Sequence, residues 1–131
     1  DIIPFLKTIE NNVSAIMISH IIATGYVNSD SVPSVVSRKL VGELRSNFSG
    51  LIITDEIRML GLKNFYKDLD EMYIDVFKAG NDLILNFDTN PWRLYHMISV
   101  IENAVKNGEI SEERINLSVI KILKAKGFNV V

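Results

Sequence analysis

The chain has 131 residues, of which 47% are hydrophobic and 23% charged, a composition typical of a folded globular domain and not of a disordered segment. Its formal net charge is −2, and no run of Lys or Arg offers a basic surface for nucleic acid or a basic amphipathic membrane helix. The chain has no cysteine, so disulfides, cysteine-ligated zinc and thiol catalysis are excluded. No apolar run approaches the roughly 18 residues of a membrane span. We therefore expect residues 1–131 to form a single segment, without nucleic-acid or membrane partners.

Helical and strand-like patterns alternate along the first half of the chain. Residues 1–11 predict an amphipathic helix with its apolar residues on one face. Continuous apolar residues over 14–19 and again over 50–54 predict two strands that are covered on both faces, as in a parallel sheet. Between them, 37–48 predicts a second helix, with Ser37 as its N-cap.

The same alternation continues in the second half. A helix is predicted over 69–79, with Gly80 as its C-cap, and a third apolar strand over 82–86. Two helices follow, over 91–107 and over 111–125, and Ser111 is the expected N-cap of the last. The order of elements is thus α-β-α-β-α-β-α-α.

Strands separated by helices predict right-handed crossovers and a parallel sheet. Three strands are few, because a free three-stranded sheet leaves two edges unpaired. The fold class that we expect is therefore α/β, the C-terminal portion of a (β/α)8 TIM-type barrel with about three parallel strands and surrounding helices. In such a barrel, the reactive side chains lie where the strands end and the following loops begin.

Polar residues occupy the predicted strand ends. Asp55 follows an apolar strand directly, where it would lie at the mouth of a barrel, although a helix cap or a solvated loop acid remains an alternative. His20 also follows a strand and could bind a ligand or be a satisfied, buried histidine. Glu56 is a weaker candidate than Asp55, because neighbouring strand residues point to opposite faces.

Other chemically interesting residues have simpler explanations. His96 falls within a predicted helix of the outer layer, Arg58 is expected to be solvated, and Met59 and Met72 by themselves suggest packing. The two histidines lack the spacing of a zinc site, and no phosphate-binding loop or nucleophile elbow occurs. Retaining glycoside hydrolysis needs a nucleophile and an acid about 5–5.5 Å apart, and the chain offers no convincing acid to accompany Asp55.

Four segments in the same order and spacing resemble family 3 glycoside hydrolases. The segments 15–20 with 33–37 resemble the sixth barrel strand of that family and the loop after it. The segment 48–59 resembles the nucleophile motif, in which an apolar strand ends in Ser/Thr-Asp and a short stretch ends in Met. The segment 78–85 resembles the family's Ala-Gly-x-Asp-hydrophobic strand, and the segment 108–123 resembles the final helix of its barrel domain.

The resemblance implies a site and an activity. It implies that Asp55 is the nucleophile of a retaining hydrolase and that His20 and Met59 contact the carbohydrate substrate. The histidine at position 20 resembles the β-N-acetylglucosaminidase branch, whose members act in the bacterial cytoplasm on peptidoglycan-derived sugars. No cofactor and no metal are implied. The family's acid-bearing Asp-x-His loop is not present in this chain, so we expect the general acid upstream of it and the chain alone to be inactive.

Two alternatives remain. The chain could belong to a β-glucosidase or β-xylosidase of the same family. It could also be a non-catalytic half-barrel that self-associates through its exposed sheet edges.

Overall fold

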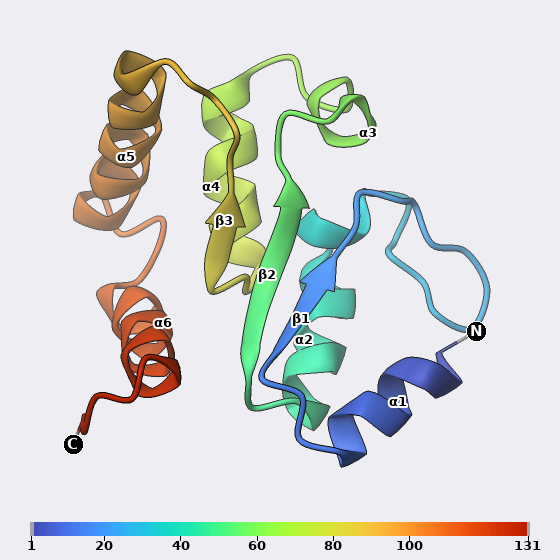
Figure 1. Cartoon of the computed structure of the whole chain (residues 1–131). Coiled ribbons are helices and arrows are strands. Elements are labelled where there is room, and N and C mark those ends of the chain that lie inside the picture. The colour runs from blue at the N-terminus through green and yellow to red at the C-terminus, as the bar shows by residue number, and fades with distance from the viewer. Residues whose placement is uncertain (1, 131) are drawn as a thin grey trace.

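Three parallel strands form the centre of the molecule. The computed structural model describes residues 2–130, in which β1 (Ala15–Ile18), β2 (Leu51–Glu56) and β3 (Leu83–Leu85) lie in the order β1-β2-β3. Ala15 faces Leu51 and Ile18 faces Thr54 across the first pair, without any interruption of the register. The predicted parallel sheet of three strands is therefore confirmed (Figure 1).

Helices connect and flank the strands. Their bounds are α1 (Ile3–Glu10), α2 (Arg38–Asn47), α3 (Leu60–Lys63), α4 (Leu69–Ala79), α5 (Pro91–Lys106) and α6 (Glu112–Ala125), with a 3-10 turn η1 (Ser34–Val36) before α2. All five predicted helices are present, although residue 1, the predicted start of the first, lies outside the described residues. The sequence did not predict α3 or η1, because a single turn is too short to display a helical period.

The helix ends follow the predicted capping chemistry. The Ser37 hydroxyl accepts a hydrogen bond from the Leu40 N–H at 3.2 Å, and the Ser111 hydroxyl accepts one from the Arg114 N–H at 3.2 Å. Each bond satisfies a backbone donor that has no partner within the helix. Gly80 ends α4 with a φ of 118°, a conformation that costs a residue without a Cβ atom very little.

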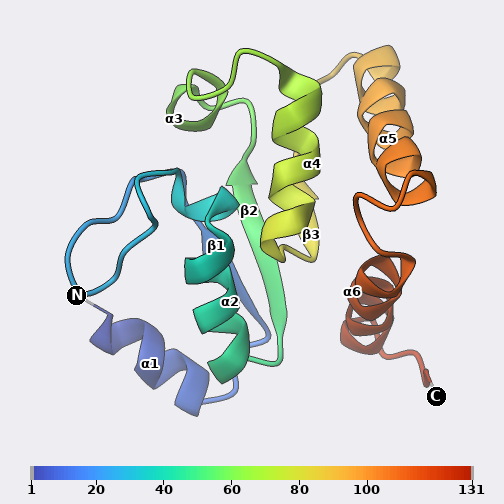
Figure 2. The ribbon, with the colours of Figure 1, turned by 180° about the vertical axis from the view of Figure 1, so that it is seen from behind.

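The two faces of the sheet differ in their cover. Helices α2 and α4 lie on one face, as the view from behind makes plain (Figure 2), and Ile52 and Thr54 on that face are fully buried. The opposite face, toward the viewer in Figure 1, carries Met17, which is 52% exposed. In a closed barrel this second face would point to the barrel axis. One covered face and one uncovered face are the geometry of a partial barrel.

Apolar surface also remains exposed on the flanking helices. In the predicted apolar stripe of α1, Ile3 is 62% and Leu6 46% exposed, whereas Ile9 packs against the core. Trp92 and Tyr95 on α5 are 80% and 64% exposed. Exposed apolar patches of this kind mark surfaces that pack against something else. Within residues 2–130 no helix is both long and apolar enough to cross a membrane.

Candidate functional site

The three strands end at one edge of the sheet, and Asp55 lies there as the penultimate residue of β2. Side chains alternate between faces along a strand, and Thr54 points into the buried layer. Ile53 lies on the open face, beside Met17 on β1 and beside Leu83 on β3, and Asp55 follows it by two residues. The sequence predicted Asp55 directly after an apolar strand, and it lies at the C-terminal end of β2.

Only one oxygen of the Asp55 carboxylate has a hydrogen-bond partner among the described residues. Its Oδ1 accepts a hydrogen bond from the Glu56 N–H at 2.7 Å, and no other partner is present within residues 2–130. The residue is partly exposed. One oxygen is thus held by the backbone, while Oδ2 is left for a ligand or for water.

His20 joins the end of β1 to the end of β2. The ring is 8% exposed, and its Nε2 lies 2.8 Å from the Glu56 carbonyl oxygen. Because a carbonyl only accepts, Nε2 carries a proton in this contact. Nδ1 is buried and has no partner among the described residues. His20 therefore holds the backbone of Glu56, the residue after Asp55.

Met59 lies just beyond the nucleophile candidate, at the start of α3. It is 48% exposed, so its thioether is accessible to a ligand rather than packed in the core. Its backbone N–H donates to the Glu56 carbonyl at 3.1 Å, which folds the chain tightly after β2. Met72, in contrast, is fully buried in the core, as its helical spacing suggested.

Glu56 and Asp88 are the other acids at this edge, and both carboxylates are engaged in hydrogen bonds or ion pairs. The Glu56 carboxylate accepts the Arg58 N–H at 3.1 Å through Oε2 and the Phe87 N–H at 3.2 Å through Oε1. The Arg58 guanidinium lies 2.7 Å from Asp88, so Arg58 is paired and not simply solvated as expected. These contacts tie the loop after β2 to the loop after β3.

Asp88 is held in its ionised form. The backbone N–H of Asn90, together with the Arg58 and Arg93 guanidinium groups, lowers the pKa of Asp88 below its usual range. A general acid needs the opposite, a raised pKa that keeps it protonated near neutral pH. Both oxygens of Glu56 accept hydrogen bonds from backbone N–H groups. Asp55 is therefore the carboxylate at this edge that keeps an oxygen without a partner among the described residues.

His96 lies on α5 and has no contact with Asp55 among the described residues. Its Nε2 is 2.7 Å from Asp70 on α4, and both side chains are largely exposed. This is the outer-layer helix position that the sequence predicted. The described residues contain no group of three or more His, Cys, Asp or Glu side chains placed to hold a metal ion.

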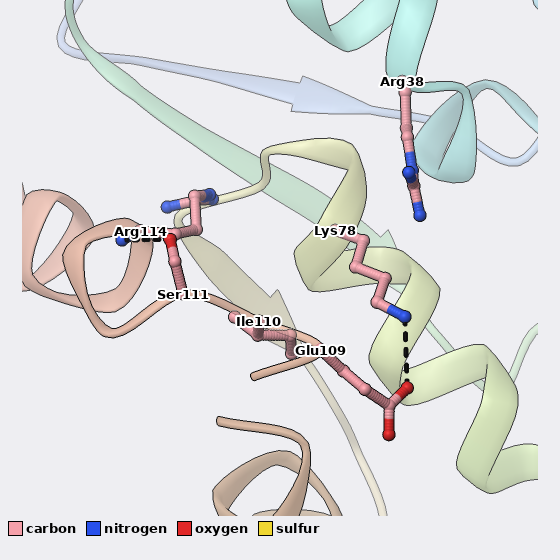
Figure 3. Close-up of a pocket in the computed structure, with 6 residues that line it drawn as sticks. All are labelled: Arg38, Lys78, Glu109, Ile110, Ser111 and Arg114. Carbon is pink, nitrogen blue, oxygen red and sulfur yellow. Dashed lines mark hydrogen bonds and ion pairs between the residues drawn. The ribbon is translucent and has the colours of Figure 1, made fainter. Parts of the chain in front are cut away.

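A hollow of about 450 Å³ lies apart from Asp55, between the ends of helices. Its lining comes from α2, α4, the loop before α6 and the first turn of α6: Arg38, Lys78, Glu109, Ile110, Ser111 and Arg114 (Figure 3). The one carboxylate in this lining, Glu109, is paired with Lys78 at 3.2 Å. Unlike Asp55, it is therefore already held in an ion pair.

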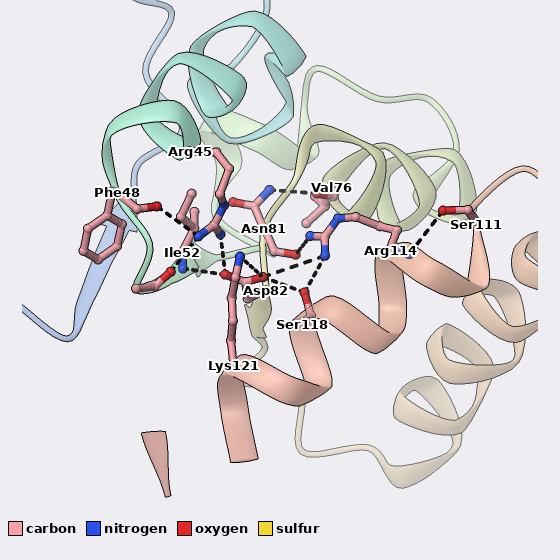
Figure 4. A network of polar contacts seen from close by, with 11 residues as sticks. Arg45, Phe48, Ile52, Val76, Asn81, Asp82, Ser111, Arg114, Ser118 and Lys121 are labelled. Atoms are coloured by element: carbon pink, nitrogen blue, oxygen red, sulfur yellow. Dashed lines mark hydrogen bonds and ion pairs between the residues drawn. The ribbon is translucent and has the colours of Figure 1, made fainter. Parts of the chain in front are cut away.

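At the opposite end of the strands, a buried carboxylate anchors the sheet. The Asp82 side chain is 0% exposed and accepts hydrogen bonds from the Ile52 N–H at 3.0 Å and the Ser118 hydroxyl at 2.6 Å (Figure 4). Three cationic side chains surround it: Arg45, Arg114 and Lys121. Asp82 thus connects α2, β2 and α6, and it fixes the strands that carry the candidate site.

These charges keep Asp82 ionised despite its burial. Burial alone would raise the pKa of Asp82, but the hydrogen bonds from Ser118 and the Ile52 N–H, with Arg45 and Lys121 nearby, outweigh it and lower that pKa. No sequence pattern predicts this cluster, since its members come from elements that are distant along the chain.

Comparison with known proteins identifies the family to which the chain is similar. The model of the glycosyl hydrolase family 3 N terminal domain matches residues 1–125. A beta-hexosaminidase of Hydrogenovibrio crunogenus is 35% identical over 88 residues, which are 65% of this chain and 24% of that protein.

Solved structures resemble the chain over nearly its whole length. A glycoside hydrolase family 3 beta-N-acetylglucosaminidase from Paenibacillus sp. is 25% identical, with a TM-score of 0.76 over 98% of this chain and 25% of the other. The beta-N-acetylglucosaminidase from Thermotoga maritima, at 23% identity, shares the fold, with a TM-score of 0.80 over 97% of this chain and 28% of the other. The chain thus spans about a quarter of the length of these relatives.

Proposed function

The chain belongs to glycosyl hydrolase family 3, and from this premise we propose that it forms part of a retaining β-N-acetylglucosaminidase in which Asp55 is the nucleophile. The proposed substrate is a terminal β-linked N-acetylglucosamine on a peptidoglycan-derived sugar, cleaved in the bacterial cytoplasm. The observation that carries the assignment of Asp55 is its placement. It is the carboxylate at the C-terminal edge of the sheet that keeps one oxygen without a protein partner.

The proposed reaction has two steps. In the first, Asp55 Oδ2 attacks the anomeric carbon, the glycosidic C–O bond breaks, and a general acid from outside this chain protonates the leaving oxygen. In the second, the same group, now a base, takes a proton from water, which attacks the anomeric carbon and releases Asp55. The sugar is released with its anomeric configuration retained, and the Asp55 carboxylate is regenerated.

His20 and Met59 are proposed to contact the sugar from either side of Asp55. The His20 ring lies at this edge and is the proposed contact of a sugar hydroxyl, since its Nδ1 has no partner among the described residues. The exposed thioether of Met59 offers an apolar surface for a ring face. Both residues lie close to Asp55 in the chain fold, since both contact the Glu56 carbonyl oxygen, His20 through its ring and Met59 through its N–H.

A panel of aryl glycosides tests the activity. We expect the full-length protein that contains this chain to release nitrophenol from 4-nitrophenyl N-acetyl-β-glucosaminide, with kcat/KM at least about tenfold above that for the matching β-glucoside and β-xyloside. A tenfold difference corresponds to about 1.4 kcal/mol of differential transition-state binding. Residues 1–131 alone should release no nitrophenol above background, because the acid partner is missing.

The panel also separates the alternatives. A preference for the β-glucoside or the β-xyloside would replace the proposed substrate with the sibling activity of the same family. Absence of turnover on all three substrates in the full-length protein would leave a family 3 fold without the proposed hydrolase function.

Self-association is a second candidate role for the chain by itself. In the sheet, β1 and β3 each have one neighbouring strand, and the open face exposes Met17. Unpaired strands and apolar surface together favour pairing with another copy.

Sedimentation of the isolated chain tests this role. We expect a mass above 14.8 kDa that falls toward the monomer in Met17→Lys, which places a charge on the open face. Tyr26→Lys, in a loop where the side chain is 97% exposed, is the matched control and should leave the mass unchanged. A monomer in the unaltered chain would reject self-association.

A further inference from the structure

The ladder between β2 and β3 is irregular next to the candidate nucleophile. Ile53 pairs with Leu83, but the next pair is Glu56 with Leu85, so β2 advances three residues while β3 advances two. The extra residue makes a β-bulge, which bends a strand and redirects the side chains around it. Asp55 lies inside this bulge.

The Thr54 side chain supplies a hydrogen-bond acceptor to β3 where the bulge interrupts the ladder. Its hydroxyl oxygen accepts a hydrogen bond from the Leu85 N–H at 3.0 Å, in the place where a main-chain carbonyl would serve in a regular ladder. Thr54 is 0% exposed, so no water reaches this bond. Without the hydroxyl, the Leu85 N–H would lose its partner in a part-buried position, and the bulge would have to relax to find another acceptor.

The far side of the bulge is fixed independently. The Ile57 N–H donates to the Leu85 carbonyl at 3.1 Å, and the His20 ring holds the Glu56 carbonyl at 2.8 Å. Asp55 is thus the residue between two anchored points, one made by a side chain and the other by the backbone. The anchor made by Thr54 can be removed by one substitution that leaves the backbone chemistry intact.

We propose that Thr54 is a positioning residue: its hydroxyl holds the β2 bulge and thereby aims the Asp55 carboxylate at the anomeric carbon. The inference rests on the proposed function and adds to it a residue that does not touch the substrate. Displacing a reacting group by about 1 Å can cost about 100-fold in rate, because the attacking atom leaves its near-attack geometry. Binding of the sugar, which depends on other groups, is affected less.

Three substitutions at this position test the proposal in the full-length protein. Thr54→Val keeps the shape and removes the acceptor, and we expect kcat on 4-nitrophenyl N-acetyl-β-glucosaminide to fall about 100-fold while KM changes less than about threefold. Thr54→Ser keeps the acceptor and should restore kcat to within about threefold. Thr54→Cys offers only a weak sulfur acceptor and should lose about tenfold in kcat, which provides a reading if the valine variant does not fold.

A matched control removes a different buried hydroxyl. Ser118→Ala deletes the donor to Asp82, next to the opposite end of β3, and should lower thermal stability while leaving kcat unchanged. A fall in kcat for Thr54→Val without a fall for Ser118→Ala separates positioning of Asp55 from a general loss of stability.

The outcomes distinguish the inference from the proposed function. If Thr54→Val and Thr54→Cys keep normal kcat, or if Thr54→Ser loses as much as Thr54→Val, the positioning role is overturned. If Asp55→Asn in the same assay series keeps normal kcat, the proposed nucleophile itself is wrong and the inference falls with it. Loss of kcat in Asp55→Asn with normal kcat in the valine and cysteine variants rejects the positioning role alone.

Discussion

Asp55→Asn is expected to lower kcat of the full-length protein on 4-nitrophenyl N-acetyl-β-glucosaminide by at least about 1,000-fold, equivalent to roughly 4 kcal/mol of transition-state stabilisation. An amide has the size of a carboxylate but lacks the charge and the nucleophilic oxygen. The Glu56 N–H would keep its acceptor, because the amide oxygen can take the place of Oδ1. The fold should therefore be preserved, and nitrophenol release measures the chemistry alone.

Two controls sharpen this test. Asp70→Asn makes the same chemical change at an exposed carboxylate whose partner is His96, and kcat should stay within about twofold of the unaltered protein. A 5-fluoro glycoside that traps the glycosyl-enzyme should add its sugar mass to the peptide containing Asp55, and fragmentation of that peptide should place the sugar on Asp55 and not on Glu56. Sugar found on Glu56 instead, or normal turnover by Asp55→Asn, would show that another carboxylate is the nucleophile.

Asp82→Asn is expected to have the largest effect on stability. The carboxylate is fully buried among three cationic groups, and its loss leaves Arg45, Arg114 and Lys121 without their shared counter-charge. Removing one partner of a buried ion pair costs about 3–5 kcal/mol, which approaches the whole stability of many domains. Urea unfolding of this chain, followed by circular dichroism, should show a midpoint shifted strongly downward or no folded baseline at all.

The pH dependence of the free energy of unfolding is a second test of the role of Asp82. Since the folded-state pKa of Asp82 is lowered, its stabilising contribution is complete above the unfolded value of about 4 and is lost as the pH falls through the lower folded value. The free energy of unfolding of the unaltered chain should therefore fall in this acid range. The slope should be smaller in Asp82→Asn, if it folds.

Asp30→Asn is the matched control, because Asp30 pairs with Lys39 at 3.3 Å on an exposed surface. Its midpoint in urea should equal that of the unaltered chain. Equal midpoints for Asp82→Asn and Asp30→Asn would contradict the anchoring role of Asp82.

Local patterns in the sequence were sufficient for the three strands, the five longer helices and the edge of the sheet that carries the candidate site. Continuous apolar runs predicted the strands, helical spacing predicted the long helices, and Ser37, Ser111 and Gly80 marked their ends, because each of these signals acts over a few residues. The position of Asp55 directly after an apolar strand placed it at the C-terminal edge, where it lies.

Tertiary structure decided everything that depends on residues far apart in the chain. The bulge that surrounds Asp55 exists only because β2 pairs with β3, and the hydrogen bond from Leu85 to Thr54 spans 31 positions. The pairing of Arg58 with Asp88 and the convergence of cations on Asp82 are equally non-local. Sequence patterns report the preference of each segment, whereas register, ion pairing and burial arise only when segments pack together. The sequence by itself therefore determined which carboxylate lies at the end of β2, and the packing of β2 against β3 decided how that residue is held.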